Sequence, residues 1–551
     1  MRDMANPLDD PLYYLHNFRQ VLLWLGQRYA DLLDPDELQF IQQFDRLPQA
    51  SQALLVRMVM RKGAHFRASK LNYLEIGCTH TAARALIEQG WVDDQGLLAF
   101  EELFALLQKG EILEAFNPWI DQPRGKKADW LAPLAVQFSD SRSFAQWCPT
   151  LSDVLYSLTV MELCDRLRLM FFGNLHQDWS EFVLADLGIY TYEKVEFCAE
   201  SRGLRHRDDV LGYLFLHQCQ LAFEAGKALE DVLAQIATLH TDNPWLEKRR
   251  AKLLFQLGQY CERSAELRLA EQIYRQCAYP GARSRLIRVL ERQEDYTQAM
   301  ALACAAQQAP ESAAEAQHLL RVMPRLRRKL GQPALPKPKP RPVSRLDLAL
   351  AIPEPLMSVE YLVQAHLSEP DAPVHYVENG LINSLFGLLC WEAIFAPLPG
   401  SFFHPFQRGP VDLHSEDFHL RRAALFAACF EQLQDERYKL TIRQRYTDKW
   451  GIQSPFVFWN LLSEELLEQA LECLPAEHLR YWFERLLLDI RANRAGMPDL
   501  IQFWPAQKTY RMIEVKGPGD RLQDNQLRWL EFCGEYQMPV TVCYVRWAQT
   551  A

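Results

Sequence analysis

Two carboxylates and one amine near the C-terminus have the types and spacing of a metal-dependent catalytic site. Asp499 begins one predicted strand, and Glu514 and Lys516 stand near the end of the next. A hairpin would fold these two strand ends together. Because alternate side chains on a strand point to the same face, Glu514 and Lys516 lie on one side of it. We therefore expect the three charged groups to converge on one point.

Such a constellation suits a hard divalent cation and chemistry on a phosphate. Carboxylates and a peptide carbonyl are oxygen ligands that Mg²⁺ or Mn²⁺ accepts. The metal can polarise a phosphate and activate water, while an amine positions that water or offsets developing charge. We predict Asp499, Glu514 and the carbonyl of Val515 as metal ligands, and Lys516 as the catalytic amine.

The elements that must position these groups form a mixed α/β pattern. Short apolar runs are separated by turn residues, first at Pro505 and then at Gly517-Pro518-Gly519. We predict strands at 499–504, 509–515 and 540–545, a turn at 505–508 and a helix at 522–533. Two strands joined by a turn, then a helix and another strand, fit an α/β core.

The rest of the chain has a predominantly helical pattern. Apolar residues recur at helical spacing from Leu15 onward. Between 211 and 304, paired amphipathic helices resemble the tetratricopeptide consensus, with Leu257-Gly258-Gln259-Tyr260 and Ala270 among the matching residues. Five prolines within 332–342 forbid a regular helix and mark the clearest domain boundary.

Basic residues gather in three regions of a chain whose formal net charge is −10. Nine Lys and Arg and no acid lie in 321–345, and the other clusters lie in 57–70 and 443–450. Such patches neutralise phosphates, and interleaved aromatics stack bases. A solvated helix face or linker is the alternative. The candidate DNA-binding residues are Arg61, Lys62, Arg67, Lys70, Arg443, Arg445, Lys449 and Arg521.

Several classes of protein are disfavoured. The 13 cysteines include no C-x-x-C pair, which argues against a zinc ribbon or a disulfide framework. The N-terminus lacks the apolar core of a signal peptide. Glu392 interrupts the apolar stretch 380–398, so we predict a buried helix there rather than a membrane span. No nucleotide-binding P-loop motif is present, and we expect a cytoplasmic protein without a membrane partner.

The order of short motifs around the hairpin resembles a known nuclease domain. Gly496-Met497-Pro498-Asp499 precedes Glu514-Val515-Lys516, and Gln526-Leu527-Arg528-Trp529-Leu530 follows. This series carries the PD-(D/E)xK signature and is similar to the VRR-NUC domain. Three further segments resemble the Fanconi-anaemia-associated nuclease family: Glu378-Asn379-Gly380, the run 385–395, and Gly409-Pro410-Val411-Asp412-Leu413.

The resemblance implies a multidomain, mostly α fold that ends in an α/β, restriction-endonuclease-like nuclease core. It places a helical N-terminal region first, then a SAP-like DNA-binding region, tetratricopeptide-like helical repeats, a basic Pro-rich linker and the VRR-NUC nuclease domain. The expected bounds are 1–60, 61–190, 191–325, 326–345 and 346–551. The chain resembles a bacterial member, because it has neither a long disordered N-terminus nor a zinc finger.

The same resemblance implies a structure-selective DNA nuclease. Family members cut branched DNA on the 5′-flap side, degrade DNA from 5′ ends and act in interstrand cross-link repair. Branched DNA is then the expected partner, and the helical repeats offer a surface for repair proteins. A junction resolvase on the same core and a non-catalytic repair scaffold are the alternatives. The intact set of Asp499, Glu514 and Lys516 argues against the scaffold.

The resemblance also adds two residues to the site. Glu378 matches a glutamate that joins the metal site in the family, with Glu392 as the competing candidate. Gln526 matches a residue expected to contact the scissile phosphate or to orient Lys516. A helix-packing role is the alternative for Gln526.

Overall fold

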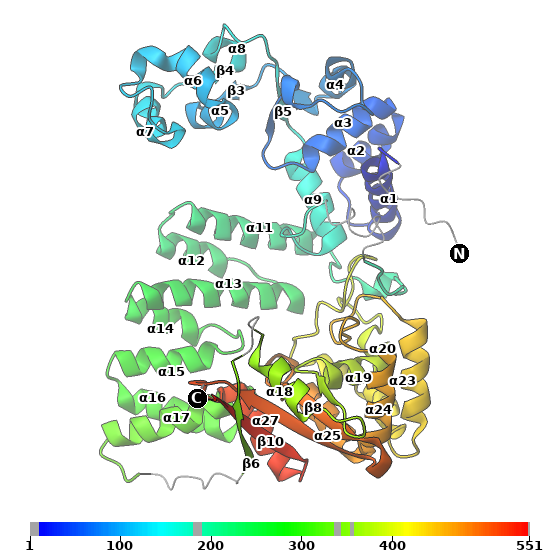
Figure 1. Ribbon diagram of the computed structural model, residues 1–551. Helices are drawn as coiled ribbons and strands as arrows, with labels where there is room; N and C mark the ends of the chain where they lie inside the picture. The colour runs from blue at the N-terminus through cyan, green and yellow to red at the C-terminus, as the bar shows by residue number, and fades with distance from the viewer. Residues whose placement is uncertain (1–9, 180–189, 335–342, 353–356, 549–551) are drawn as a thin grey trace. The chain divides into compact units, whose positions relative to one another are not determined.

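The computed structural model describes residues 10–179, 190–334, 343–352 and 357–548 (Figure 1). The chain divides into two compact units: 1–191 with 198–214, and 192–197 with 215–551. Helices dominate both units, and a five-stranded sheet lies in the second. The expected mostly helical chain with a C-terminal α/β core is therefore confirmed. Within the described ranges, no helix has the length and apolar character needed to cross a membrane.

The first unit begins with a helical bundle and a small antiparallel sheet. Helix α2 starts at a capping box, in which Glu37 N donates to Asp34 Oδ1 at 2.9 Å and Asp34 N donates to Glu37 Oε2 at 3.0 Å. The sheet has the order β1-β5-β2. The elements are α1 (Tyr13–Arg28), α2 (Pro35–Arg46), α3 (Gln49–Val59), β1 (His65–Arg67), α4 (Thr79–Glu88), β2 (Val92–Asp93), β5 (Leu155–Leu158) and α9 (Met161–Phe172).

A second core of the same unit is built on aromatic side chains. The Phe100 ring packs against the rings of Phe116 and Trp147 at centroid distances of 5.3 and 5.7 Å. These residues belong to a separate buried cluster, so this segment has its own apolar core. Its elements are β3 (Leu97–Leu98), α5 (Phe100–Leu106), α6 (Lys109–Phe116), α7 (Lys127–Gln137), β4 (Arg142–Ser143) and α8 (Phe144–Trp147).

The second unit contains a stack of helices, the solenoid, drawn in green in Figure 1. Gly258 of α13 faces Tyr274 of α14 so closely that an added Cβ would lie 2.6 Å from the Tyr274 ring. The small residue therefore lets the paired helices approach, as the repeat pattern predicts. The helices are α11 (Arg207–Glu224), which begins in the first unit, α12 (Leu229–Ala237), α13 (Pro244–Arg263), α14 (Leu267–Arg275), α15 (Ala282–Arg292), α16 (Tyr296–Gln308) and α17 (Ala313–Lys329).

The five-stranded sheet has the order β6-β10-β9-β8-β7. Strands β7, β8 and β9 are antiparallel neighbours, whereas β10 runs parallel to both β9 and β6. The strands are β6 (Ser344–Leu350), β7 (Val374–Tyr376), β8 (Leu500–Trp504), β9 (Thr509–Lys516) and β10 (Val540–Trp547). The predicted strands and the helix, observed as α27 (Asp524–Glu535), are thus present within two residues of their expected bounds.

Alternate residues of the hairpin enter two different apolar cores. Ile513 and Val515 pack in one cluster with Val363 of α18 (Val359–Leu367), while Met512 packs in the other with Trp529 of α27. Glu514 and Lys516 share the face of Met512 by the period of two. The remaining helices are α19 (Leu381–Leu389), α20 (Trp391–Ile394), α21 (Phe418–Arg421), α22 (Ala423–Glu431), α23 (Arg437–Asp448), α24 (Glu464–Cys473), α25 (Ala476–Leu488) and α26 (Ile490–Asn493).

The segment expected as a linker is regular at both ends. Helix α17 continues to Lys329, and β6 begins at Ser344. Pro324 lies inside α17 and is tolerated there. The Pro-rich stretch 335–342 lies outside the described residues.

Candidate active site

The β8–β9 hairpin brings the predicted catalytic groups together. Leu500 pairs with Ile513 across the hairpin, which sets Asp499 beside the end of β9. The backbone N–H of Val515 donates to Asp499 Oδ2 at 2.8 Å. The Lys516 ammonium lies 2.7 Å from Glu514 Oε1. The spatial convergence expected from the sequence is therefore present.

Glu378 joins this group through the edge strand β7. The backbone N–H groups of Val377 and Glu378 both donate to the Asp499 carbonyl at 2.9 Å. Glu378 adopts a φ of +28°, a left-handed value that is uncommon for a residue with a side chain. The structure thus sets Glu378 beside Asp499, and its role as a metal ligand remains a prediction. Glu392, the competing candidate, is instead ion-paired with Arg445 at 2.6 Å.

The Glu378 carboxylate is held by two neighbours. The Tyr376 hydroxyl donates to Oε2, and Asn379 Nδ2 donates to Oε1 at 3.1 Å. The hydrogen bond to Glu378, together with burial, raises the pKa of Tyr376 far above its ordinary range. Tyr376 is therefore a neutral donor that orients the carboxylate.

Asn379 also connects Glu378 to the segment that leads into Asp499. Its side-chain oxygen accepts from the backbone N–H groups of Gly496 at 2.7 Å and Met497 at 3.1 Å. Gly496 has a φ of +93°, and an added Cβ would lie 2.8 Å from Asn525. The loop can follow this path only with glycine at that position.

Burial makes both hairpin carboxylates reluctant to ionise. Burial, with smaller contributions from the carboxylates of Glu360 and Glu378, raises the pKa of Asp499 to about 6, and the Val515 N–H and Lys516 oppose this shift. Burial and the charge of Asp499 raise the pKa of Glu514 to about 7, and Lys516 opposes this shift. Acids perturbed in this way by desolvation and by like charges are typical of functional sites.

The donor set fits a divalent cation. Glu514 is 0% exposed; the Lys516 ammonium lies 2.7 Å from its Oε1, and its Oε2 has no hydrogen-bond partner among the described residues. A buried carboxylate with unfilled oxygens is costly without a cation or a proton. The three carboxylates are not already gathered into a cage, since no group of three possible ligands among the described residues encloses an ion. The fit to a divalent cation therefore rests on the type of donor atom, carboxylate oxygen, and not on a preformed cage.

Sequence reasoning missed three residues of this site. Tyr376 and Asn379 flank Glu378, and Glu360 at the start of α18 acts on Asp499 through its charge. The motif comparison contained Asn379 but assigned it no role. Glu360 lies outside the motifs, and it is the packing of α18 that brings its carboxylate close enough to raise the pKa of Asp499.

Comparisons with known proteins agree with this geometry. Three family models match: "FAN1, HTH domain" at residues 12–93, "Fanconi anemia-associated nuclease SAP domain" at 97–147 and "VRR-NUC domain" at 433–547. The Pseudomonas aeruginosa protein "Fanconi-associated nuclease 1 homolog" is 60% identical over 540 residues, which cover 98% of this chain and 97% of that protein. The chain belongs to the Fanconi-associated nuclease 1 family. The bacterial relative confirms the expected bacterial member.

Two further likenesses support the assignment to this family. The chain is similar to paFAN1 in a crystal structure with 2-nt 5′-flap DNA with a gap, with a TM-score of 0.92 and 59% identity over 98% of this chain and 99% of that one. Human "Fanconi-associated nuclease 1" is 29% identical over 197 residues, or 34% of this chain and 19% of the human protein. Glu378 lies upstream of the residues that the VRR-NUC model matches.

Gln526 and Arg521 lie around the start of α27 in this family member. Gln526 Oε1 accepts from the backbone N–H of Gln523 at 2.9 Å, which caps the helix. Arg521 is exposed, and no ion pair of Arg521 exists among the described residues. Asp520 accepts from the N–H of Gly517 at 2.9 Å and so closes the intervening turn. Phosphate contacts by Gln526 and Arg521 remain predictions.

The four predicted DNA-binding cations between 61 and 70 differ in their exposure to solvent. Arg61, Lys62 and Lys70 are exposed. Arg67 is only 6% exposed, and its guanidinium pairs with Glu111 at 2.6 Å and with Asp153 at 2.8 Å. Arg67 therefore links elements of the first unit internally, whereas its three neighbours face solvent.

The cations of 443–449 are all paired. Arg443 contacts Glu468 at 2.7 Å, Arg445 contacts Glu392 at 2.6 Å and Lys449 contacts Glu193 at 2.8 Å. Glu193 also accepts from the Trp391 indole at 2.8 Å. These pairs tie α23 to neighbouring elements of the nuclease core. DNA contact by Arg443, Arg445 and Lys449 remains a prediction, and it would compete with these pairs.

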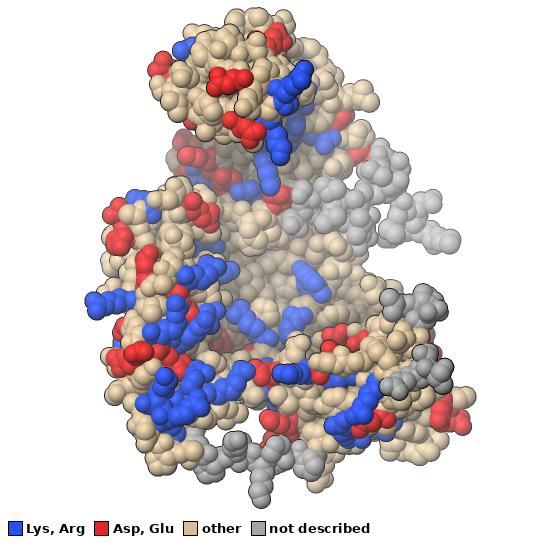
Figure 2. Space-filling view, turned by 60° about the vertical axis from the view of Figure 1, so that its left-hand side comes forward, with Lys and Arg blue, Asp and Glu red and all other residues tan. Residues whose placement is uncertain are grey.

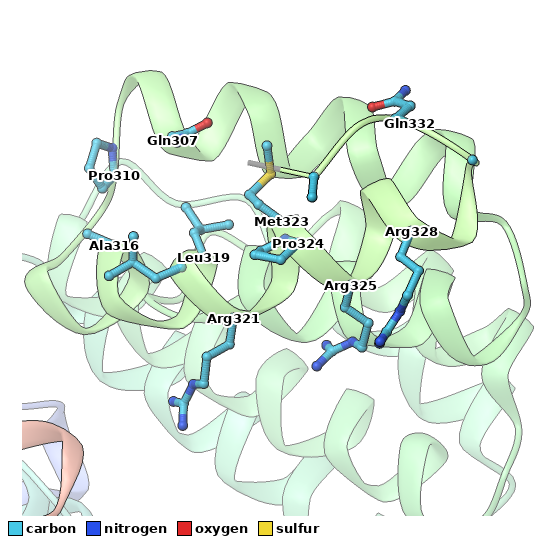
Figure 3. A pocket seen from close by; sticks show the side chains of 13 residues that line it. Gln307, Pro310, Ala316, Leu319, Arg321, Met323, Pro324, Arg325, Arg328 and Gln332 are labelled. Carbon is cyan, nitrogen blue, oxygen red and sulfur yellow. The ribbon is translucent and has the colours of Figure 1, made fainter. Parts of the chain in front are cut away.

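The cations of α17 line a cavity of about 1180 Å³ (Figure 3). Arg321, Arg325 and Arg328 project from one side of the helix, apart from the apolar Leu319 and Met323. Arg321 pairs with Asp524 of α27 at 2.6 Å, and Arg325 pairs with Glu291 at 2.7 Å. Part of the basic run thus joins the solenoid to the nuclease core.

A further basic cluster on the solenoid escaped the sequence analysis. Glu262 of α13 is buried and receives Arg288 at 2.9 Å and Arg285 at 3.3 Å. These three residues line a cavity of about 350 Å³, which Arg292 and Arg263 also line. The arginines outnumber the carboxylate, so the cluster is positive. Figure 2 shows basic side chains gathered over the face of the solenoid helices.

Proposed function

We propose that this nuclease hydrolyses phosphodiester bonds of branched DNA that carries a 5′ flap. The observation that carries the proposal is the convergence of Asp499, Glu514, Lys516 and Glu378 in a member of the Fanconi-associated nuclease 1 family. The flap substrate is supported by paFAN1, which was crystallised with 2-nt and 1-nt 5′-flap DNA. We also propose 5′→3′ exonuclease activity and a role in interstrand cross-link repair in the cytoplasm, as the family resemblance implies.

In the proposed mechanism, Glu378, Asp499, Glu514 and the carbonyl of Val515 would hold Mg²⁺ or Mn²⁺. A bound cation of this kind polarises the phosphate and lowers the pKa of water. Lys516 positions the attacking water and offsets charge on the phosphate. The hydrogen bonds from Tyr376 and Asn379 would hold the Glu378 carboxylate in the orientation that metal binding needs.

The distribution of basic clusters over separate parts of the chain supports a substrate with several arms. We propose that the nuclease domain begins near 346, upstream of the matched VRR-NUC residues, because β6 and β7 belong to its sheet and β7 leads into Glu378. The exposed Arg61, Lys62 and Lys70 and the positive cluster around Glu262 would contact phosphates of the arms. The solenoid also offers a surface for repair proteins.

A substrate panel tests this function. Labelled 5′-flap, 3′-flap, four-way junction and linear duplex DNA should be incubated with Mg²⁺, Mn²⁺ or a chelator, and the cuts mapped. The proposal expects cleavage of the 5′-flap substrate near the junction, only with metal. Faster cleavage of the four-way junction would favour a resolvase, and absence of cleavage with every DNA would favour a scaffold.

A further inference from the structure

An open cavity of about 640 Å³ lies beside the candidate active site, although none of the three predicted metal-ligand carboxylates lines it. Tyr376 lines it, and the hydroxyl of the same residue donates to Glu378. The cavity therefore begins one hydrogen bond from a predicted metal ligand. Its volume lies within the roughly 300–1,000 Å³ of pockets that bind small ligands.

The cavity presents aromatic surface to solvent. Tyr361 of α18 lines it and is 49% exposed, with its ring 5.4 Å from that of Tyr376. Trp459 lines it as well, and its indole N–H donates to the Ile452 carbonyl at 2.7 Å, which fixes the ring. Tyr361 is thus an exposed ring and Trp459 a half-buried, fixed one, and aromatic rings at a surface are stacking platforms for nucleobases.

Polar groups with free hydrogen-bonding capacity complete the lining. Arg408 uses Nε to donate to the Ser454 carbonyl at 2.8 Å, and its guanidinium has no ion pair among the described residues. The carboxamides of Asn460 and Gln453 make no hydrogen bond within the part of the chain that the structure describes. No acidic side chain lines the cavity as far as the described residues define it.

These groups match the parts of a nucleotide. A ring can stack on the base, a carboxamide can both donate to and accept from the base edge, and a guanidinium can bind a phosphate. The cations of α23 differ, since each is neutralised by a carboxylate. An apolar peptide side chain would leave the carboxamides unpaired, so a nucleotide suits the cavity better.

We propose that this cavity binds one unpaired nucleotide of the DNA strand next to the scissile phosphate. Its base stacks on Tyr361, Asn460 contacts the base edge and Arg408 contacts its phosphate. The inference rests on the proposed nuclease function and adds a subsite to it. Because stacking dominates, binding should depend little on the identity of the base.

Photocrosslinking of the wild-type protein tests the contact directly. 5-Iodouracil would be placed singly at positions on either side of the cleavage point in flap DNA, and the complex irradiated in chelator so that no cleavage occurs. Peptide mapping should locate the adduct at Tyr361 or Trp459 for a position adjacent to the cut. Adducts found only outside the cavity would overturn the proposal.

Binding measurements with variants provide a second test. Tyr361→Ala should weaken affinity for flap DNA about 5- to 100-fold in chelator, the loss expected for one stacked base. Tyr361→Phe should restore wild-type affinity, and Asn460→Ala should weaken binding less than Tyr361→Ala. Leu425→Ala on α22 is the control, because Leu425 is 41% exposed and does not line the cavity.

The outcomes separate this subsite from the nuclease function. If the wild-type protein cuts no DNA, the nuclease proposal fails. If it cuts flap DNA but Tyr361→Ala and Asn460→Ala bind as tightly as the wild type, the nucleotide subsite alone fails. The binding readout in chelator is independent of any effect that Tyr361 has on Glu378 through Tyr376.

Discussion

Glu514 is buried with the Lys516 ammonium 2.7 Å from its Oε1, and this burial has a consequence for the metal-free protein. Its pKa is raised to about 7, whereas an exposed glutamate titrates near 4.3. The folded state therefore favours the protonated form. Below the unfolded pKa the two states bind the proton equally, and stability falls as pH rises toward the folded pKa. The pH window runs from about 4 to about 7.

We predict that Glu514→Gln stabilises the metal-free protein, and more so at pH 8 than at pH 5. The amide removes the cost of ionising a buried acid, on the order of 3–4 kcal/mol at pH 8. Differential scanning calorimetry in chelator would give the melting temperature of both proteins at each pH. A difference that shrinks from pH 5 to pH 8 would contradict the account.

Asn379 provides a second prediction at the residue scale. Asn379→Ala removes the hydrogen bonds to Glu378, Gly496 and Met497, so both metal-ligand segments lose their connection. We expect metal affinity to fall about tenfold or more, equivalent to roughly 1.4 kcal/mol. Titration calorimetry with Mn²⁺ measures this without turnover.

Asn379→Asp separates the two contacts of this side chain. The carboxylate still accepts from Gly496 and Met497, but it cannot donate to Glu378 and repels it. If the hydrogen bonds to Gly496 and Met497 alone account for the effect of Asn379 on metal affinity, Asn379→Asp should bind Mn²⁺ like the wild type. A metal affinity unchanged in Asn379→Ala would show that Asn379 does not position the site.

At the scale of elements, the hairpin could be predicted because residues close together in the sequence determine it. Alternating apolar residues and the Pro505 turn define β8 and β9, and a period of two then fixes the common face of Glu514 and Lys516. The pairing of β7 with β8 spans more than 100 residues and leaves no local pattern. Glu378 was therefore found through a family resemblance, and Tyr376 only through the structure.

The Glu262 cluster shows a similar limit. Arg285, Arg288 and Arg292 recur at helical spacing and predict one basic face of α15. Their partner lies on α13, and the stacking of the solenoid sets that contact. A buried carboxylate beneath a basic face cannot be predicted from charge spacing alone.

The close contact between α13 and α14 yields a prediction about packing. An added methyl at Gly258 would meet the buried Tyr274 ring at 2.6 Å, so Gly258→Ala should destabilise the solenoid by about 1–3 kcal/mol. Gly534→Ala in α27 is the matched control, because a methyl added there would have no described atom within 4 Å. It should be neutral or stabilising by up to about 1 kcal/mol. Equal melting temperatures for the two variants would contradict this packing account.

At the scale of the whole molecule, the net charge of −10 does not show which Lys and Arg side chains lack a carboxylate partner and could bind DNA. The sequence identified the basic regions but could not distinguish exposed charges from paired ones. Arg67 and the cations of α23 are engaged by carboxylates, whereas Arg61, Lys62 and Lys70 are exposed. Which carboxylate neutralises which cation depends on tertiary packing.

We predict that replacing Arg61, Lys62 and Lys70 together by glutamine weakens binding to flap DNA with little effect on the cleavage rate at saturation. Each lost phosphate contact should lower the slope of log affinity against log salt by about one unit. Arg67→Gln should instead lower the melting temperature, since it leaves Glu111 and Asp153 without their partner. An unchanged affinity and salt slope in the triple variant would assign these cations to a solvated face.

The central claim is that Asp499 and Glu514 hold the metal that DNA cleavage requires. The most direct measurement compares the rate of cutting of labelled 5′-flap DNA by the wild type, Asp499→Ala and Glu514→Ala at saturating Mn²⁺, with DNA affinity and melting temperature measured on the same samples. The account predicts that each variant loses cleavage by at least about a hundredfold while its DNA affinity and folding are retained. Cleavage at the wild-type rate by either folded variant would contradict the account.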